Sequence, residues 1–187
     1  MSTLKLVGIS SKSIGSRDKN QPAILNYGLV NACSVNNKTE SVVDFILDHK
    51  LHILCITETW LQSEDRFTTN DVTPNGFSVV SNPRLNRRGG GVAVIIKSNL
   101  RYKKLANVLF STFEVLLLLV TSFTKSLAIA TIYKSPGPLG NFLTQLSEFL
   151  STLVAKYDDF MLAGDFNIHM DKETDESSKK LTALLKN

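Results

Sequence analysis

Short apolar runs that each end in one polar side chain are the main pattern in this sequence. Four such runs are too short for a helix and are bounded by turn residues or by helix-like segments. This pattern predicts buried strands. The runs and the polar residues that follow them are 27–30 before Asn31, 51–57 before Glu58, 126–132 before Tyr133 and 162–164 before Asp165.

Two longer segments carry apolar residues at helical spacing. Residues 39–49 begin at Thr39, a candidate N-cap, and place Val42 and Ile46 on one face. Residues 139–157 repeat the pattern, with apolar side chains three and four positions apart. Both segments are therefore predicted to be amphipathic helices that pack on a sheet.

Further strand candidates lie between the two predicted helices and are separated by turns. Hairpins therefore dominate the centre of the chain, which favours an antiparallel or mixed sheet over a purely parallel one. The predicted fold class is α/β. These central strand candidates are 77–81, 91–96, 115–120 and 127–132.

The composition agrees with one folded domain. The chain has 187 residues, of which 43% are hydrophobic and 20% are charged, enough for a substantial core. Its two cysteines, Cys33 and Cys55, lie in or beside predicted strands and suggest neither a disulfide framework nor a zinc site. Residues 1–23 lack periodicity and are expected to be a loose N-terminal leader, so the domain is assigned to residues 24–187.

No stretch has the character of a targeting segment or the length of a membrane span. The aliphatic run 113–120 is far too short to cross a bilayer and is better explained as a buried strand. We therefore expect a soluble intracellular protein, nuclear or cytoplasmic, with no membrane partner.

The charge points mildly toward a polyanionic partner. The formal net charge is +4 and the isoelectric point is about 9.1. Arg84, Arg87 and Arg88 precede the glycine run 89–91, where guanidinium groups and backbone amides could lie along a nucleic-acid backbone. Arg87 and Arg88 are therefore candidate nucleic-acid contacts. The alternative is an exposed hairpin loop that its charges keep soluble.

The polar residues at the strand ends suggest a site for phosphoester chemistry. In layered α/β folds, ligands bind outside the carboxyl ends of strands, so these side chains could converge on one pocket. Asp165 and Asn167 are two positions apart and would face the same way from an extended strand. An acid can orient water or hold a metal, and an amide can donate to a phosphate oxygen. The alternative is an Asx turn in which both side chains cap backbone N–H groups.

Six sequence blocks, in order, resemble the endonuclease/exonuclease/phosphatase superfamily. Within it they are most similar to the apurinic-endonuclease-like domain of LINE-type (non-LTR) retrotransposons. The blocks are Leu-Val-Asn-Ala-Cys-Ser (29–34) with Asn-Lys (37–38), Ile-Thr-Glu-Thr-Trp-Leu (56–61), Arg-Gly-Gly-Gly-Val-Ala-Val (88–94), Thr-Phe-Glu (112–114), Ile-Tyr-Lys-Ser-Pro (132–136) and Leu-Ala-Gly-Asp-Phe-Asn-Ile-His (162–169).

The resemblance implies a metal-dependent nuclease that nicks DNA. Glu58 would bind the metal with help from Asn31, and Tyr133 would contact the phosphate near the leaving group. Asp165 and Asn167 would position the attacking water and the scissile phosphate. The implied metal is Mg²⁺, with Mn²⁺ possible, and no small-molecule cofactor is expected. The implied fold is an incomplete DNase I-like one, a two-layer or four-layer α/β sandwich with mixed, largely antiparallel sheets.

The sequence departs from the retrotransposon branch at two places. Cys33 stands where members usually have Arg, and Lys-Ser-Pro (134–136) stands where they usually have Arg-Pro-Pro. Lys134 keeps the positive charge and is expected to bind nucleic acid, although without the planar fork of arginine. Trp60, beside Glu58, is expected to pack in support of the site rather than to stack on a base.

The family completes its site with a late segment that carries Ser/Thr-Asp-His. Nothing after Asn167 matches this segment, so the domain is expected to lack its C-terminal part. His169 is a possible substitute for the missing histidine, but a turn or surface histidine is the simpler interpretation.

Two alternatives to an active nuclease stay open from the sequence. One is a catalytically dead remnant that at most binds nucleic acid. The other is a phosphatase or phosphodiesterase of the same superfamily that acts on a small molecule or a lipid.

Overall fold

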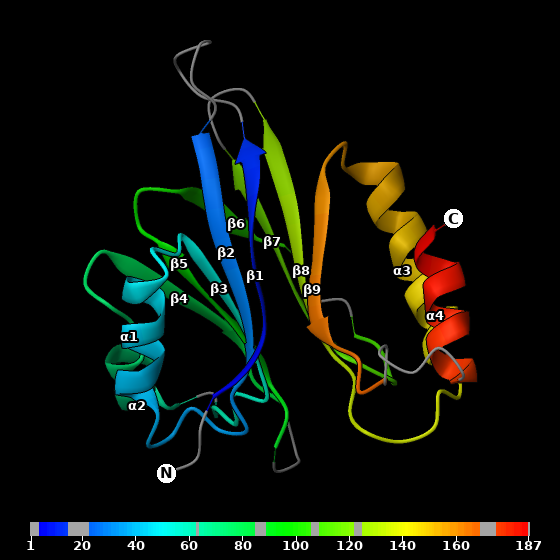
Figure 1. Ribbon diagram of the computed structural model, residues 1–187, viewed down its shortest axis with the longest axis horizontal. Coiled ribbons are helices and arrows are strands. Elements are labelled where there is room, and N and C mark those ends of the chain that lie inside the picture. The colour runs from blue at the N-terminus through cyan, green and yellow to red at the C-terminus, as the bar shows by residue number, and fades with distance from the viewer. Residues whose placement is uncertain are drawn as a thin grey trace.

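The computed structural model describes residues 4–14, 23–62, 64–84, 89–105, 109–121, 125–168 and 175–186. Within these residues the strands form two sheets (Figure 1). The first sheet has the order β1 (Lys5–Ile14), β2 (Ala23–Asn31), β3 (Ile53–Thr57), β5 (Val92–Lys97), β4 (Phe77–Asn82). The second has the order β6 (Arg101–Lys104), β7 (Glu114–Thr121), β8 (Ser126–Tyr133), β9 (Phe160–Asp165).

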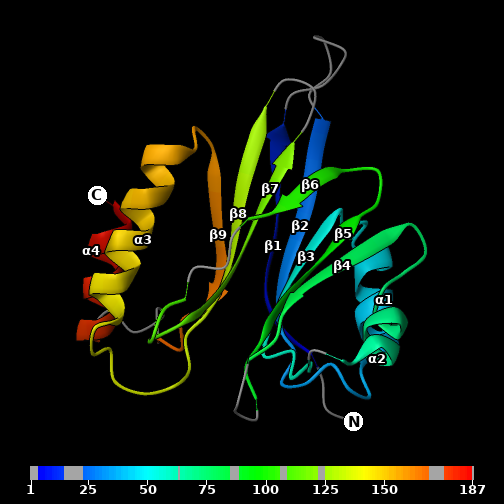
Figure 2. The ribbon, with the colours of Figure 1, turned by 180° about the vertical axis from the view of Figure 1, so that it is seen from behind.

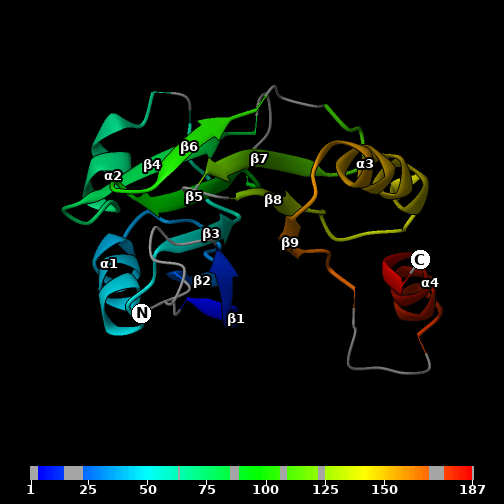
Figure 3. The ribbon, with the colours of Figure 1, turned by 90° about the horizontal axis from the view of Figure 1, so that it is seen from above.

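The two sheets pack face to face and helices cover their outer faces. Helices α1 (Thr39–Asp48) and α2 (Arg66–Asp71) lie outside the first sheet, and α3 (Phe142–Lys156) and α4 (Glu176–Lys186) lie outside the second (Figures 2 and 3). Strands β2 and β3 are parallel, as are β8 and β9, and the other neighbours are antiparallel. The molecule is therefore a four-layer α/β sandwich with mixed, largely antiparallel sheets, one of the two arrangements that the sequence predicted.

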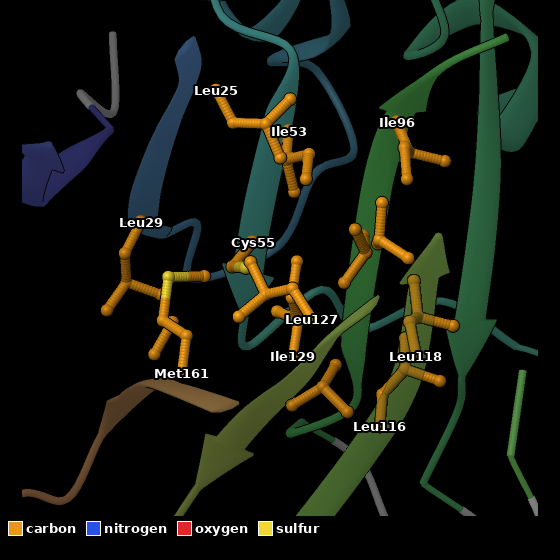
Figure 4. Packing of buried hydrophobic residues seen from close by; sticks show 14 of the residues in the cluster. Leu25, Leu29, Ile53, Cys55, Ile96, Leu116, Leu118, Leu127, Ile129 and Met161 are labelled. Carbon is orange, nitrogen blue, oxygen red and sulfur yellow. The ribbon is translucent and has the colours of Figure 1, made fainter. Parts of the chain in front are cut away.

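Alternation along the central strands explains this layering. On β5, Val94 and Ile96 face the second sheet, whereas Ile95 between them packs with the residues under α1. Side chains from both sheets meet in the middle layer, as the close-up of this core shows (Figure 4). Central strands are apolar on both faces because each face is covered, so they appear in the sequence as continuous apolar runs.

Besides the core between the two sheets and the core under α1, a third hydrophobic core lies between the second sheet and its helices. Phe142, Leu146, Phe149 and Leu153 recur along α3 and are buried against β7 and β8, and Leu181 of α4 joins them. The predicted helix at 139–157 is confirmed with slightly narrower bounds. The predicted helix at 39–49 is also confirmed, but Lys38 occupies its N-cap position and no side chain caps it.

The N-terminal segment differs from the expectation of a loose leader. Residues 5–14 form β1, which pairs antiparallel with β2 at the edge of the first sheet. An edge strand with a polar outer side need not show strong hydrophobic alternation, and backbone pairing with a neighbour holds it in place. The expectation was therefore wrong for residues 5–14.

Among the residues that the structure describes, none of the helices combines the length and apolar character of a membrane span.

Candidate active site

Parallel pairing brings the predicted strand ends together. On the first sheet, Asn31 at the end of β2 lies beside Thr57, the residue before Glu58. On the second sheet, Tyr133 at the end of β8 lies beside Asp165 at the end of β9. The carboxyl ends of both parallel pairs meet where the two sheets pack, which is the convergence that the sequence predicted.

One amide connects the two sheets at this point. The Asn31 side-chain nitrogen donates to Glu58 Oε1 at 2.9 Å and to Asp165 Oδ2 at 2.7 Å. The Asn31 oxygen accepts from the backbone N–H of Cys33 at 3.0 Å, which fixes the orientation of the amide. Asn31 therefore bridges two carboxylates as a donor, and its oxygen faces away from them.

The loop that carries Glu58 has an unusual and well-anchored backbone. Glu58 has a φ of 52°, a left-handed conformation that is uncommon for a residue with a side chain. Its carbonyl accepts from Ser34 N–H at 2.8 Å, and the next residue, Thr59, donates to the Gly91 carbonyl at 3.2 Å. These bonds hold Glu58 in a conformation that costs energy, as is common at functional sites.

Asp165 and Asn167 meet through a turn rather than along a strand. Strand β9 ends at Asp165, and Asn167 adopts a φ of 50°. The Asn167 backbone N–H donates to Asp165 Oδ1 at 2.9 Å, and the Asn167 side chain donates to the Lys134 carbonyl at 2.7 Å. The Asx turn is therefore present at Asp165, whereas the Asn167 side chain donates to a carbonyl and caps no N–H. The turn keeps both side chains at the candidate site.

Tyr133 is held as a neutral phenol. Its side chain is only 4% exposed, and burial is the largest cause that raises its pKa. A hydrogen bond to Glu58 and the negative charges of Glu58 and Asp165 raise the pKa further, while Arg84 acts in the opposite direction. Tyr133 therefore keeps its proton on Oη and serves as a hydrogen-bond donor at physiological pH.

An ion pair that the sequence did not reveal supports Tyr133. Arg84 donates to the Glu114 carboxylate and, at 2.7 Å, to Ser135 Oγ, and its guanidinium lies 5.6 Å from the centre of the Tyr133 ring. Glu114 also accepts from the Gly91 N–H at 2.5 Å. Arg84 appeared as part of a basic surface cluster and Glu114 as part of a short block, so only their spatial contact identifies the pair.

Lys134 does not lie where a nucleic-acid contact was expected. Its side chain is 2% exposed, and its Nζ donates to the carbonyls of Ser135 at 3.0 Å and Gly137 at 2.9 Å. The ammonium group also lies 5.7 Å from the centre of the Phe142 ring. This lysine stabilises its own loop, and we correct its assignment accordingly. Arg87, Arg88 and His169 fall outside the described residues.

The described histidines also lie away from the site. His52 accepts a hydrogen bond from the backbone N–H of Asn26 at 3.1 Å, near the start of β3, and burial lowers its pKa. His49 packs against Phe45 of α1 with the two rings tilted by 36° and their centres 4.4 Å apart. Both are accounted for by local structure.

The donor set at the site fits a small divalent cation. Glu58 and Asp165 share one amide donor, and neither has a lysine or arginine at ion-pair distance among the described residues. No group of three or more acidic, histidine or cysteine ligands occurs in the described parts of the chain. Mg²⁺ usually keeps several waters and takes only one or two carboxylates, so two are sufficient.

The sequence and the fold agree on the family. The profile of the Endonuclease/Exonuclease/phosphatase family matches residues 25–185. The chain belongs to this family, whose members are generally dependent on a divalent metal. No curated protein matches the sequence closely enough to count as a relative.

Solved structures share the fold at low sequence identity. The endonuclease domain of TRAS1, a telomere-specific non-LTR retrotransposon, has a TM-score of 0.67 and 15% identity over 86% of this chain and 70% of that chain. The AP endonuclease LMAP from Leishmania major has a TM-score of 0.65 and 16% identity over 83% of this chain and 64% of that chain. Humanized TDP2 from D. rerio has a TM-score of 0.58 and 13% identity over 78% of this chain and 63% of that chain. The chain thus spans less than two thirds of the last two structures.

Proposed function

We propose that this chain is a metal-dependent phosphodiesterase of the retrotransposon endonuclease type, which nicks DNA with Mg²⁺ or Mn²⁺. The observation that carries the proposal is the Asn31 amide that joins Glu58 of one sheet to Asp165 of the other. Two carboxylates gathered at the carboxyl ends of strands, without a cationic partner, attract a cation. The similarity to two structures that are named as endonucleases supports DNA as the substrate.

Each site residue has a role that its contacts permit. Glu58 and Asp165 would hold the metal, which polarises the phosphate and stabilises the negative charge that develops in the reaction. Asp165 is oriented through both of its oxygens, by Asn31 and by the Asn167 N–H, so it is also placed to orient a water. Tyr133 donates a hydrogen bond to a phosphate oxygen, and Asn167 retains one amide hydrogen for the same purpose.

Nicking of supercoiled plasmid by the purified chain tests the proposal. Wild type should nick with Mg²⁺ and not with EDTA, and Asp165→Asn should lower the rate by about 100- to 10,000-fold because it removes the acid that orients water. Asp159→Asn is the matched control, since Asp159 lies before the other end of β9 and should leave nicking unchanged. Equal nicking by Asp165→Asn and wild type would contradict the assignment.

One observation favours a second candidate, a nucleic-acid-binding domain without catalysis. Neither described histidine lies at the site, whereas the resemblance to the superfamily implies a histidine there. A folded chain that retards DNA but does not nick it would support this candidate. Hydrolysis of a small phosphoester without any nicking of DNA would instead favour a superfamily phosphatase.

A further inference from the structure

Trp60 lies two residues after Glu58 and is partly exposed, which differs from the expectation that it packs in support of the site. Its side chain is 45% exposed, whereas its neighbours Thr59 and Leu61 are buried. Large aromatic side chains are normally buried on average, so a half-exposed tryptophan between buried neighbours needs an explanation. It is also the only tryptophan in the chain.

The backbone presents this side chain in a fixed position. Trp60 has a φ of 56°, and its N–H donates to the Gly90 carbonyl at 2.9 Å. On the other side of the same loop, Val35 N–H donates to the Thr59 carbonyl at 3.0 Å. The loop is therefore held by two neighbouring loops, and ordering it on binding would cost little.

One edge of the indole rests on a glycine. A Cβ atom added at Gly89 would come within 3.6 Å of the indole Nε1, so the glycine backbone lies directly beside the ring. The indole N–H has no hydrogen-bond partner in the part of the chain that the structure describes. The ring is thus supported at one edge, while much of its surface and its donor remain available to a ligand.

The short distance along the chain from Glu58 to Trp60 limits how far from the bound phosphate the indole can contact a ligand. Two residues span at most about 7 Å of chain, so the indole loop lies within one or two nucleotides of a phosphate held at Glu58. Aromatic side chains bind unpaired bases by stacking, with little dependence on base identity. Paired bases inside a duplex do not expose a face for this contact.

We infer that Trp60 stacks on an unpaired nucleobase next to the phosphate held at the site. The substrate that suits this arrangement is a DNA strand with an unstacked base beside the scissile phosphate, such as a single strand or a junction with one. The inference rests on the proposed function, because it takes the phosphate position from the Glu58 and Asp165 site. It adds that the chain contacts the base of a nucleotide as well as its phosphate.

Emission from Trp60 tests the inference directly because no other tryptophan contributes. The probes are a short oligothymidylate and a base-free chain of the same length and charge, both with Ca²⁺ in place of Mg²⁺ to limit cleavage. Oligothymidylate should quench the emission and the base-free chain should not. Equal quenching by the two probes, or none by either, would overturn the inference.

Three substitutions separate stacking from other contacts. Trp60→Ala should weaken binding of oligothymidylate by about 5- to 100-fold and leave binding of the base-free chain unchanged, as measured by anisotropy of labelled probes. Trp60→Phe should retain most of the affinity because it keeps an aromatic face. Trp60→Leu is apolar but not aromatic, so it should behave as Trp60→Ala does. Wild-type affinity in Trp60→Leu would show a merely apolar contact and contradict stacking.

The two proposals can fail separately. If wild type nicks plasmid but all Trp60 variants bind oligothymidylate equally, the stacking inference is wrong and the nuclease proposal stands. If wild type neither nicks plasmid nor binds either probe, both are wrong. Because the side chain is exposed, the variants should melt at the wild-type temperature, which thermal unfolding can check.

Discussion

The two ends of the strands that carry the site differ in how their charges are balanced. Before the amino end of β9, the Asp159 carboxylate lies 3.3 Å from Lys12 Nζ and 3.9 Å from Lys125 Nζ. At the carboxyl end, Glu58 and Asp165 share an amide and have no cationic partner among the described residues. The charge of Asp159 is therefore balanced by lysines of the chain, whereas the charges of Glu58 and Asp165 are left for a ligand to neutralise.

The backbone differs between the two ends of the first sheet in the same way. Gly76, before β4, has a φ of 82° with open space where a side chain would be. Gly91, before β5 at the site end, has a φ of 80°, but a Cβ there would lie 2.7 Å from Thr59 Oγ1. The two glycines have nearly the same φ, so the ends differ in packing: the backbone at the site end is in close contact with Thr59, and the backbone at Gly76 is not.

Removing the shared amide should be among the largest effects on stability. Asn31→Leu leaves two carboxylates without their common donor, so we expect a loss of about 2–3 kcal/mol in the free energy of unfolding, measured with urea in EDTA. Mg²⁺ should recover part of that loss because a cation can take the place of the amide between the carboxylates. Asn26→Leu, at the other end of β2, removes one exposed hydrogen bond and should cost about 1 kcal/mol or less. Equal losses of unfolding free energy in the two variants would mean that the Asn31 amide is no more important to stability than the exposed Asn26 amide.

Replacing Gly76 and Gly91 with alanine tests whether the backbone is packed more tightly at the site end of the first sheet. Gly76→Ala introduces only left-handed strain, about 1 kcal/mol, whereas Gly91→Ala adds a close contact with buried Thr59 and should cost about 2–3 kcal/mol. Chemical unfolding of both variants measures the difference. If Gly91→Ala were no worse than Gly76→Ala, the packing of the Thr59 loop against this turn would not be tight.

The smallest effect is expected at the balanced end. Asp159→Asn breaks ion pairs whose side chains are 33% to 61% exposed, so solvent screening limits the loss to about 0–1 kcal/mol. The loss should shrink further in high salt, which thermal unfolding at two salt concentrations can measure. A loss above that of Asn31→Leu would reverse the comparison.

Much of the fold follows from the sequence because most strands and the helices α1 and α3 have a clear apolar pattern. The strand before Asn31, the strand before Glu58 and the helix 142–156 are all where the apolar pattern placed them. Strand β1 was missed because an edge strand is held by backbone pairing, which leaves little trace in side-chain pattern.

The sequence predicted that the residues of the candidate site lie together, but it did not predict their geometry. Polar residues after apolar runs located Asn31, Glu58, Tyr133 and Asp165, because parallel strands end at a common edge. The sequence could not show that Asn31 turns its nitrogen toward both carboxylates, since the Cys33 N–H fixes that choice. It also could not separate Lys134 from a surface lysine, because its carbonyl partners come from a loop conformation.

The account depends most on the claim that Glu58 and Asp165 form a cation site, and a Mg²⁺ titration of the melting temperature tests it directly. At ten times the dissociation constant, binding should add about 1.4 kcal/mol and raise the melting temperature of wild type by about 3 °C or more. Glu58→Gln should show no such rise, and Asp159→Asn should respond like wild type. A rise of equal size in Glu58→Gln, or none in wild type, would contradict the claim.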